Sequence, residues 1–432
     1  MAFTVGLILL ITFAIMLILG VPISISIGIA SIISTAVIVP FEIGIFTSAQ
    51  KIFSGIDSFA LLAIPFFVLS GNIMNKGGIA IKLINFAKLI GGRLYGALWH
   101  TNILGNMLFG SISGSSVAAA AAIGGTMASL QEKEGYDKRY SAAVNIASAP
   151  SGQLIPPSGA LILFSLVSGG TSISALFLAG YIPGILMGLG CMIVSYIIAR
   201  KNNYPIANKY SLKEAIMITL DALPSLFLIV IVIGGIIKGV FTATEAAAVS
   251  VLYTFVLSLI YKTLKLSEIP KILLDTVVMT GIITFLISAS SIMSWVMAYT
   301  GIPNAVSSFI LSISNNKYII LLIINITLLL VGTFMDLTPA VLIFTPIFLP
   351  IVTNLGLHPV HFGLILIFNL CIGSITPPVG SVLFIGCNVG KVTIEDVIKP
   401  LIPYFIVLII ILLLITYIPD IALFLPKMLN LI

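Results

Sequence analysis

The sequence predicts an all-α polytopic membrane protein. Of its 432 residues, 59% are hydrophobic and only 8% are charged, whereas soluble domains carry about 25% charged residues. A transmembrane helix needs roughly 20 apolar residues. Stretches that reach or approach this length lie at 4–39, 175–199, 217–237, 246–261, 318–334 and 401–418. In such a chain the net charge of +6 indicates topology and not nucleic-acid binding.

An internal repeat predicts that the chain is built from two halves. The Gly-Pro-Pro-Gly pattern of "GQLIPPSG" at 152–159 returns in "GSITPPVG" at 373–380. Two further pairs keep the same order, with "GSISGSSVA" (110–118) matching "GTFMDLTPA" (332–340) and "GVPISISIGIAS" (20–31) matching "GVFTATEAAAVS" (239–250). We therefore predict a first repeat at 1–200, a polar cytoplasmic linker at 201–213 and a second repeat at 214–432.

Each half is expected to contain scaffold helices, a helical hairpin and a proline-broken helix. Two successive prolines remove amide donors and clash with carbonyls of the preceding turn. In lipid, the freed carbonyls must be buried in protein or line a wet cavity. The predicted hairpins lie near 98–130 and 318–351, and the predicted broken helices near 141–167 and 362–389.

Basic residues predict that the two halves have opposite topology. Three clusters are separated by pairs of crossings and should share the cytoplasmic side: Lys133, Lys138 and Arg139; Arg200, Lys201, Lys209 and Lys213; Lys262, Lys265 and Lys271. Loops 168–174 and 352–361 contain no Lys or Arg and should lie outside. This assignment places the N-terminus outside, and the repeats become inverted, as in many secondary transporters.

The motifs at the two hairpin tips predict ion and substrate chemistry. Carbonyls freed by a broken helix are hard oxygen donors that suit Na⁺, and the alternative is a packing kink satisfied by neighbouring hydroxyls. In "GSISGSS", Ser115 and Ser116 would stand at a helix N-terminus, which favours a carboxylate. The alternative there is packing of small residues between helices.

Asp336 is the acidic residue expected at membrane depth in the second tip. It could ligate a cation or accept hydrogen bonds from a polyhydroxyl substrate, and it could also cap the helix that follows. "TATE" at 242–245 predicts a capping box, with Thr242 as N-cap and Glu245 as the third helical residue.

Other classes of protein fit less well. An intramembrane serine hydrolase needs a histidine beside the nucleophile, but His100, His358 and His361 are interpreted as interfacial residues. A passive channel would not need paired tips with both cation and anion chemistry. No Walker A pattern supports an ATP-driven pump. We therefore predict a secondary transporter and not an enzyme.

Five motifs together resemble the large membrane subunit of tripartite ATP-independent periplasmic (TRAP) transporters. They are "GSISGSSVAAAAAIGG", "LIPPSG", "GVFTATEAAAV", "GTFMDLTPAVLIFTPI" and "ITPPVGSVLF", and they span nearly the whole chain. The resemblance implies a Na⁺-coupled elevator transporter in a bacterial inner membrane. It also implies a small four-helix membrane subunit and a periplasmic substrate-binding protein. Because the chain starts close to its first large-subunit helix, we expect the small subunit to be a separate polypeptide.

The resemblance also implies particular site residues. Two Na⁺ sites would lie between each tip and its broken helix, one formed by Ser113, Ser116, Gly152 and Pro156, the other by Gly332, Asp336, Gly373, Thr376 and Pro377. The substrate carboxylate would lie between the tips, near Ser115 and Ser158, with Asp336 as a further substrate contact. Substrates of this family are organic acids. Sialic acid is the first expectation, and C4-dicarboxylates or other sugar acids are the alternatives.

Overall fold

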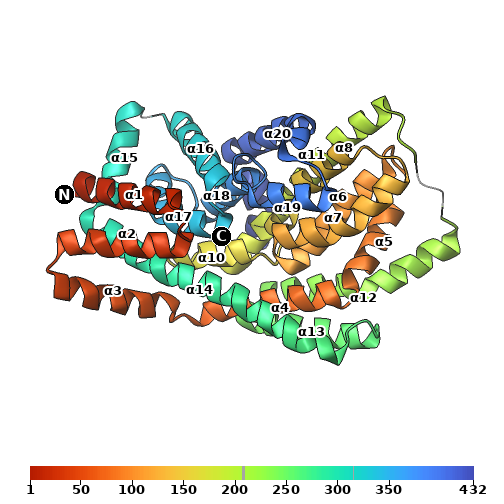
Figure 1. Ribbon diagram of the computed structural model, residues 1–432, viewed down its shortest axis with the longest axis horizontal. Coiled ribbons are helices and arrows are strands. Elements are labelled where there is room, and N and C mark those ends of the chain that lie inside the picture. The colour runs from red at the N-terminus through yellow and green to blue at the C-terminus, as the bar shows by residue number, and fades with distance from the viewer. Residues whose placement is uncertain (207–209, 315) are drawn as a thin grey trace.

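The chain folds into helices joined by short turns (Figure 1). The computed structural model describes residues 1–206, 210–314 and 316–432, and this part of the chain contains no strand. Within it, eight helices are long and apolar enough to cross a membrane. The all-helical membrane fold expected from composition is therefore confirmed.

The N-terminal half begins with five helices and a 3₁₀ turn, followed by the hairpin region and a long final helix. The elements are α1 (Ala2–Ile18), α2 (Ile23–Ile38), α3 (Phe41–Ile56), η1 (Phe59–Leu62), α4 (Ala63–Lys76), α5 (Ile79–Gly91), α6 (Ala97–Ser113), α7 (Ser116–Lys133), α8 (Lys138–Ser148), α9 (Ser151–Leu154), α10 (Gly159–Val167) and α11 (Ile173–Lys201). The unbroken apolar stretch at 4–39 is divided at residues 19–22, where Gly20 has φ +76° and Pro22 precedes α2.

The C-terminal half also contains a helical hairpin and a proline-broken helix. Its elements are α12 (Leu212–Ile237), α13 (Ala243–Ile260), η2 (Leu266–Glu268), α14 (Ile269–Thr300), α15 (Ile302–Ile313), α16 (Lys317–Phe334), α17 (Leu337–Asn354), α18 (Pro359–Gly373), α19 (Ser381–Gly390), α20 (Ile394–Tyr417) and α21 (Asp420–Met428). The hairpin is formed by α16–α17 and the broken helix by α18–α19. The predicted capping box is confirmed, because Thr242 and Glu245 exchange both capping bonds at the start of α13.

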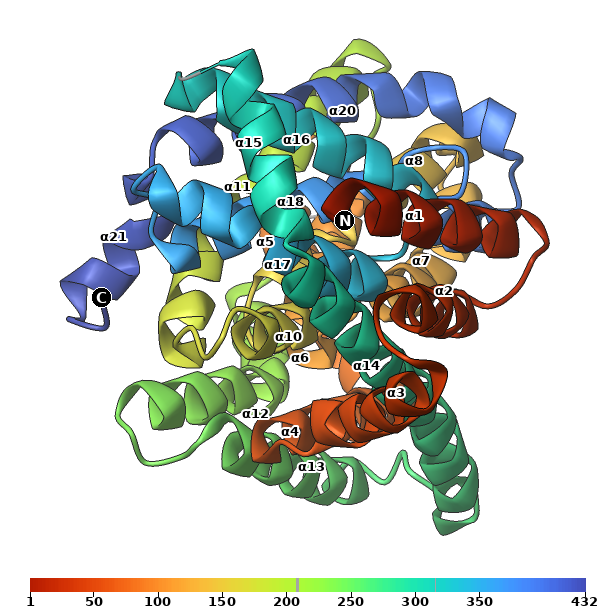
Figure 2. The ribbon, with the colours of Figure 1, turned by 90° about the vertical axis from the view of Figure 1, so that its left-hand side faces the viewer.

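The helices form an outer frame and an inner group. In the frame, α4 packs on α13, and α2 and α3 pack on α14, which crosses the view diagonally in Figure 2. The inner group joins α6–α11 of the first half to α16–α20 of the second, with α18 packed on α16 and α19 packed on α7. Elements of both halves are thus interleaved in each group, as a repeat of matched elements predicts.

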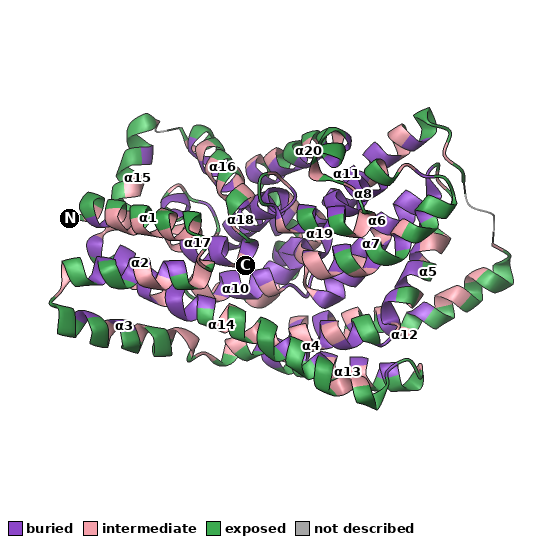
Figure 3. Cartoon of the chain, in the orientation of Figure 1, coloured by how far each residue is buried: buried purple, intermediate pink, exposed green. Residues whose placement is uncertain are grey.

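Burial follows this division in part. Among the inner helices, α6, α8, α10 and α18 are largely buried, whereas α16 and α20 and the frame helices carry exposed faces (Figure 3). Those faces are apolar: Phe46 of α3 is 72% exposed and Val230 of α12 is 60% exposed. Apolar surface of this extent marks contact with lipid or with another protein, which agrees with a membrane location.

The start of the linker is anchored to the inner group. Tyr204 stacks on Tyr136 with ring centroids 4.6 Å apart, and its hydroxyl accepts a hydrogen bond from the Asp137 amide. The Pro205 carbonyl accepts from the amides of Gly96 and Ala97 at the start of α6. Figure 1 shows this linker at the opposite end of the molecule from the N-terminus. Lys209, assigned above to a cytoplasmic cluster, lies outside the described residues.

Candidate functional site

The first hairpin tip is a two-residue turn between α6 and α7. Gly114 has φ +64°, a left-handed conformation that glycine adopts without strain. Ser115 is the N-cap of α7 and accepts a hydrogen bond from the Ala118 amide at 3.2 Å. Ser116 donates to the Gln153 side chain at 2.7 Å, which ties the tip to the broken helix formed by α8, α9 and α10. The Ser113 hydroxyl is buried and has no hydrogen-bond partner among the described residues.

Each hairpin crosses its broken helix at a pair of glycines. A Cβ atom built on Gly110 would lie 2.6 Å from the Gly152 Cα, and one built on Gly332 would lie 2.9 Å from the Gly373 Cα. Such close backbone approach is possible only without side chains. The two crossings occupy matching places in the two halves, so the repeat seen in the sequence reappears as matched geometry.

The second tip presents a carboxylate. Asp336 occupies the N-cap position of α17, but its side chain makes no capping hydrogen bond. Instead, its Oδ1 accepts a hydrogen bond from the Ser381 hydroxyl at 3.0 Å, across the proline break before α19. The Val379 amide donates to the Thr333 carbonyl nearby, at 3.1 Å. Capping therefore does not account for an acidic side chain at this position.

Both tips line one cavity of about 480 Å³ between the inner group and the frame. Its polar lining comes from Ser24, Ser113, Ser115, Ser116, Gln153, Asp336, Thr338 and Ser374. Its apolar wall comes from frame helices α2, α4 and α14, including Phe67 and Leu286. The arrangement can hold a ligand between hydroxyls of one tip and a carboxylate of the other, beside the largely apolar wall of the frame.

The structure separates the predicted residues into two sets. Ser113, Ser115, Ser116 and Asp336 meet at the cavity, whereas Ser158 does not line it. Ser158 is fully buried, and its hydroxyl caps α10 by accepting from the Leu161 amide. Its predicted substrate contact is therefore not provided by this geometry.

The remaining predicted positions do not line the cavity. Gly152 and Pro156 are buried at the first break, while Gly332 and Gly373 form the second crossing. Thr376 and Pro377 are half-buried, and the Thr376 hydroxyl donates to the Ile372 carbonyl at 2.7 Å. The Pro156–Pro157 and Pro377–Pro378 bonds are both cis.

Five polar residues of the site were missed from the sequence, among them Ser24 and Thr338 of the cavity lining. Gln153 and Ser374 line the cavity, and Ser381 contacts Asp336. The repeat alignment held a usable signal, since Gln153 and Ser374 each follow the crossing glycine of their own half. No comparable pattern marks Ser381.

Two of the three histidines interpreted as interfacial are buried within the protein, each in the first turn of a helix. His100 and His361 are buried, and their Nε2 atoms lie 3.1 Å from the Tyr95 carbonyl and 2.8 Å from the Ile415 carbonyl. Burial in lipid-embedded protein is possible because each ring finds a backbone partner. His358 lies at a helix end, as the N-cap of α18.

Comparison with known proteins gives consistent matches over the whole chain. Residues 10–421 match the family described as the tripartite ATP-independent periplasmic transporter, DctM component. The YgiK protein of Salmonella typhimurium is 54% identical, with 96% of each chain covered. The sialic acid TRAP transporter large permease protein SiaM of Vibrio cholerae is 39% identical, with 89% of this chain and 90% of that one covered.

A third relative has a different named substrate. The C4-dicarboxylate TRAP transporter large permease protein DctM of Rhodobacter capsulatus is 36% identical over 95% of this chain and 96% of its own length. Among solved structures, the YdaH transporter of Alcanivorax borkumensis is similar with a TM-score of 0.64 and 12% identity, over 86% of this chain and 88% of that one. This last likeness concerns the fold alone.

Proposed function

Because the chain belongs to the DctM component family of tripartite ATP-independent periplasmic transporters, we propose that it imports an organic acid anion together with Na⁺. It is a multi-pass membrane permease subunit and not an enzyme. The observation that carries the proposal is the cavity into which both hairpin tips project. A site shared by two moving hairpins and a fixed frame suits alternating access by an elevator mechanism.

Features of the first tip support sodium binding. The buried Ser113 hydroxyl, which has no hydrogen-bond partner in the described part of the chain, is an oxygen that a small hard cation could use. It lies at the tip beside Ser116, whose bond to Gln153 joins the hairpin to the first broken helix. At the second tip the Asp336 carboxylate can supply a further oxygen. These donors fit the two predicted Na⁺ sites, which would take hydroxyl, carboxylate and backbone oxygens.

The polar groups that line the cavity between the tips support a polyhydroxylated acid as the substrate. The Ser115 region and the N-terminus of α7 can receive a carboxylate, while Asp336 can accept hydrogen bonds from hydroxyl groups. A C4-dicarboxylate would bring a second negative charge toward Asp336, which is electrostatically unfavourable. We therefore propose sialic acid first, then other sugar acids, and C4-dicarboxylates last. The cavity of about 480 Å³ is large enough for such a sugar acid.

The proposed assembly contains two further proteins. A separate small four-helix membrane subunit would cover part of the exposed apolar frame, and a periplasmic binding protein would deliver the acid. The complex would lie in the bacterial inner membrane, with the N-terminus of this chain in the periplasm.

The coupling prediction tests the proposed function directly. The protein is reconstituted in liposomes with both partner proteins, and uptake of radiolabelled sialic acid is followed. We expect uptake with an inward Na⁺ gradient and at least about tenfold less uptake when K⁺ replaces Na⁺. The reason is that an empty cation site leaves the negative charge of the bound acid without a positive charge nearby. Unlabelled succinate should compete poorly. Equal uptake in K⁺, or uptake that requires ATP, would contradict the mechanism.

The topology prediction uses the two ends of α11. This helix has 29 residues and no charge before Arg200, so its length of about 43 Å exceeds the roughly 30 Å of bilayer hydrocarbon. Asn202 and Ser172 flank it, and both are exposed. With Cys191, Cys371 and Cys387 replaced by serine, we expect Asn202→Cys to react with a membrane-impermeant maleimide only from the cytoplasmic side. Ser172→Cys should react only from the periplasmic side. Labelling of both from one side would exclude the predicted orientation.

A further inference from the structure

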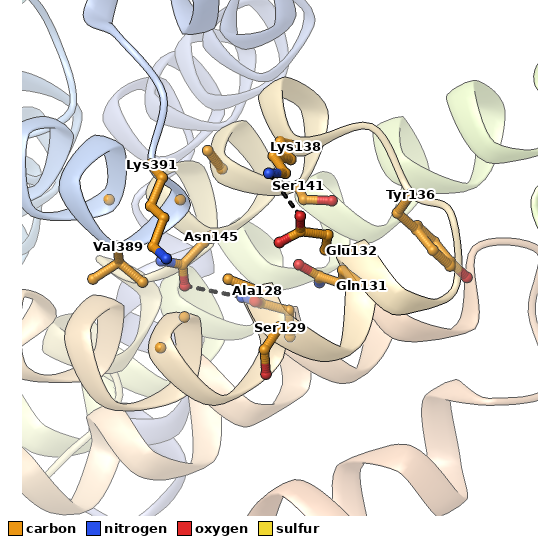
Figure 4. Close-up of a pocket in the computed structure, with 16 residues that line it drawn as sticks. Ala128, Ser129, Gln131, Glu132, Tyr136, Lys138, Ser141, Asn145, Val389 and Lys391 are labelled. Carbon is orange, nitrogen blue, oxygen red and sulfur yellow. Dashed lines mark hydrogen bonds and ion pairs between the residues drawn. The ribbon is translucent and has the colours of Figure 1, made fainter.

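A second cavity lies in the inner group, away from the two hairpin tips. Its volume is about 190 Å³, and it is bounded by the C-terminal part of α7, the start of α8 and the end of α19 (Figure 4). It therefore lies between the first hairpin, formed by α6 and α7, and the broken helix of the second half, formed by α18 and α19. None of its lining residues lines the cavity between the tips.

Glycines open this second cavity. A Cβ atom on Gly390 would lie 2.9 Å from the Ala142 Cβ, and side chains at Gly124 and Gly386 would meet Asn145 and Ile146. Gly125 faces open space, with no heavy atom within 4 Å of an added Cβ. The helices thus approach closely around a hollow that remains accessible.

The charges around the second cavity do not cancel. Glu132 and Lys138 form an ion pair at 2.8 Å, whereas Lys391 forms no ion pair within the described part of the chain. In Figure 4 the Lys391 side chain lies beside Asn145, on the other side of the pocket from Glu132 and Lys138. The lining thus holds two ammonium groups, Lys138 and Lys391, and one carboxylate, Glu132, and both lysines lower the pKa of that carboxyl group. The excess of one positive charge favours a ligand with a single negative charge.

Two buried polar groups have unused hydrogen-bonding capacity. Asn102 is fully buried, and its Oδ1 has no partner among the described residues, while its Nδ2 donates to Asn145 at 3.0 Å. Ser141 is 6% exposed and accepts a bond from the Trp99 indole at 3.0 Å, but its own hydroxyl hydrogen has no acceptor in the described structure. Buried groups of this kind normally find partners. Asn102 requires a donor, and Ser141 can supply one to an acceptor.

We propose that the second cavity is a binding site for a small hydroxycarboxylate of about six to ten non-hydrogen atoms. Lys391 and the Ser141 hydroxyl receive the carboxylate, and a ligand hydroxyl donates to Asn102 Oδ1. The ligand contacts both halves of the chain, through Asn102 of α6 and Ser141 of α8 in the first half and Lys391 at the C-cap of α19 in the second. Under the predicted topology it enters from the cytoplasm, because the turn between Lys133 of α7 and Lys138 of α8 is assigned to that side.

The indole of Trp99 provides the measurement, since it bonds directly to Ser141. In the W295F protein Trp99 is the single tryptophan, so its fluorescence reports on the second cavity. Purified W295F protein is titrated with D-glycerate, which has one carboxylate and two hydroxyls. We expect a saturable change in fluorescence. Propionate, which lacks hydroxyls, and glycerol, which lacks the charge, should each bind at least about tenfold more weakly.

Variants separate this site from the cavity between the tips. Lys391→Gln should weaken glycerate binding at least about tenfold, whereas Lys133→Gln, an exposed lysine outside the cavity lining, should leave it unchanged. Asp336→Asn should also leave it unchanged, even if that variant no longer transports. The proposal fails if glycerate gives no saturable change, or if Lys133→Gln and Lys391→Gln behave alike. Loss of binding in Asp336→Asn would assign the signal to the tips, and equal binding of inorganic phosphate would exclude recognition of a hydroxycarboxylate.

Discussion

Asp336→Asn is expected to reduce sodium-driven uptake by about 10- to 150-fold while the protein still inserts and assembles. Hydrogen bonds and contacts to a charged group contribute about 1.5–3 kcal/mol, which corresponds to that range in affinity. The substitution keeps the volume, and the new side-chain oxygen can still accept the bond from Ser381. It therefore removes the negative charge alone. Uptake is measured against Na⁺ and substrate concentration in proteoliposomes.

Ser381→Ala is the matched control for the charge. It removes the hydroxyl that contacts Asp336 but leaves the carboxylate in the cavity, so we expect only a few-fold loss. Since Asp336 makes no capping bond to α17, a weakened helix start cannot explain a large effect of Asp336→Asn. Near-normal uptake by Asp336→Asn, or an equal loss in both variants, would show that the carboxylate does not bind an ion or the substrate.

Gly373→Ala and Gly152→Ala are expected to abolish uptake and to lower the melting temperature of the purified protein. Each added methyl group would collide with the backbone of the opposing glycine, Gly332 or Gly110. Overpacking against side chains costs about 1–3 kcal/mol, and a backbone atom cannot move aside as a side chain does. The hairpin must therefore shift away from its broken helix, which separates the parts of both proposed sodium sites.

Gly234→Ala is the matched control for the glycine crossings. Gly234 lies inside α12, and an added Cβ would have no heavy atom within 4 Å. Alanine favours a helix over glycine by about 1 kcal/mol, so stability should stay level or rise and uptake should be unchanged. If Gly373→Ala behaves like Gly234→Ala in both measurements, the close crossing is not needed for transport.

Local patterns were sufficient to predict the helical class and several helix boundaries. The Thr242–Glu245 capping box is an example, because its partners lie three residues apart and need no distant contact. The breaks at Pro156–Pro157 and Pro377–Pro378 were also predicted, since a proline pair interrupts a helix in any surroundings. The hairpin tips followed from glycines and hydroxyls next to apolar runs, and the structure places turns at Gly114–Ser115 and Met335–Asp336.

Whether a polar side chain lines the cavity or is enclosed in the protein depended on contacts between distant parts of the chain. Ser115 and Ser158 have the same local signature as N-caps, yet Ser115 lines the cavity between the tips and Ser158 is enclosed behind it. The buried His361 ring pairs with the Ile415 carbonyl, 54 positions away in the chain. Neither result could be derived from neighbouring residues.

The sequence by itself determined that this chain is a helical membrane protein made of two matched halves, because hydropathy, caps and proline breaks act over a few residues. Tertiary structure alone decided that Ser381 meets Asp336 from 45 positions away, that glycines of each half cross at backbone contact, and that α7 and α19 enclose a second cavity. Such pairings depend on how the helices pack against one another, and close packing is set by the shape of whole surfaces and not by local preference.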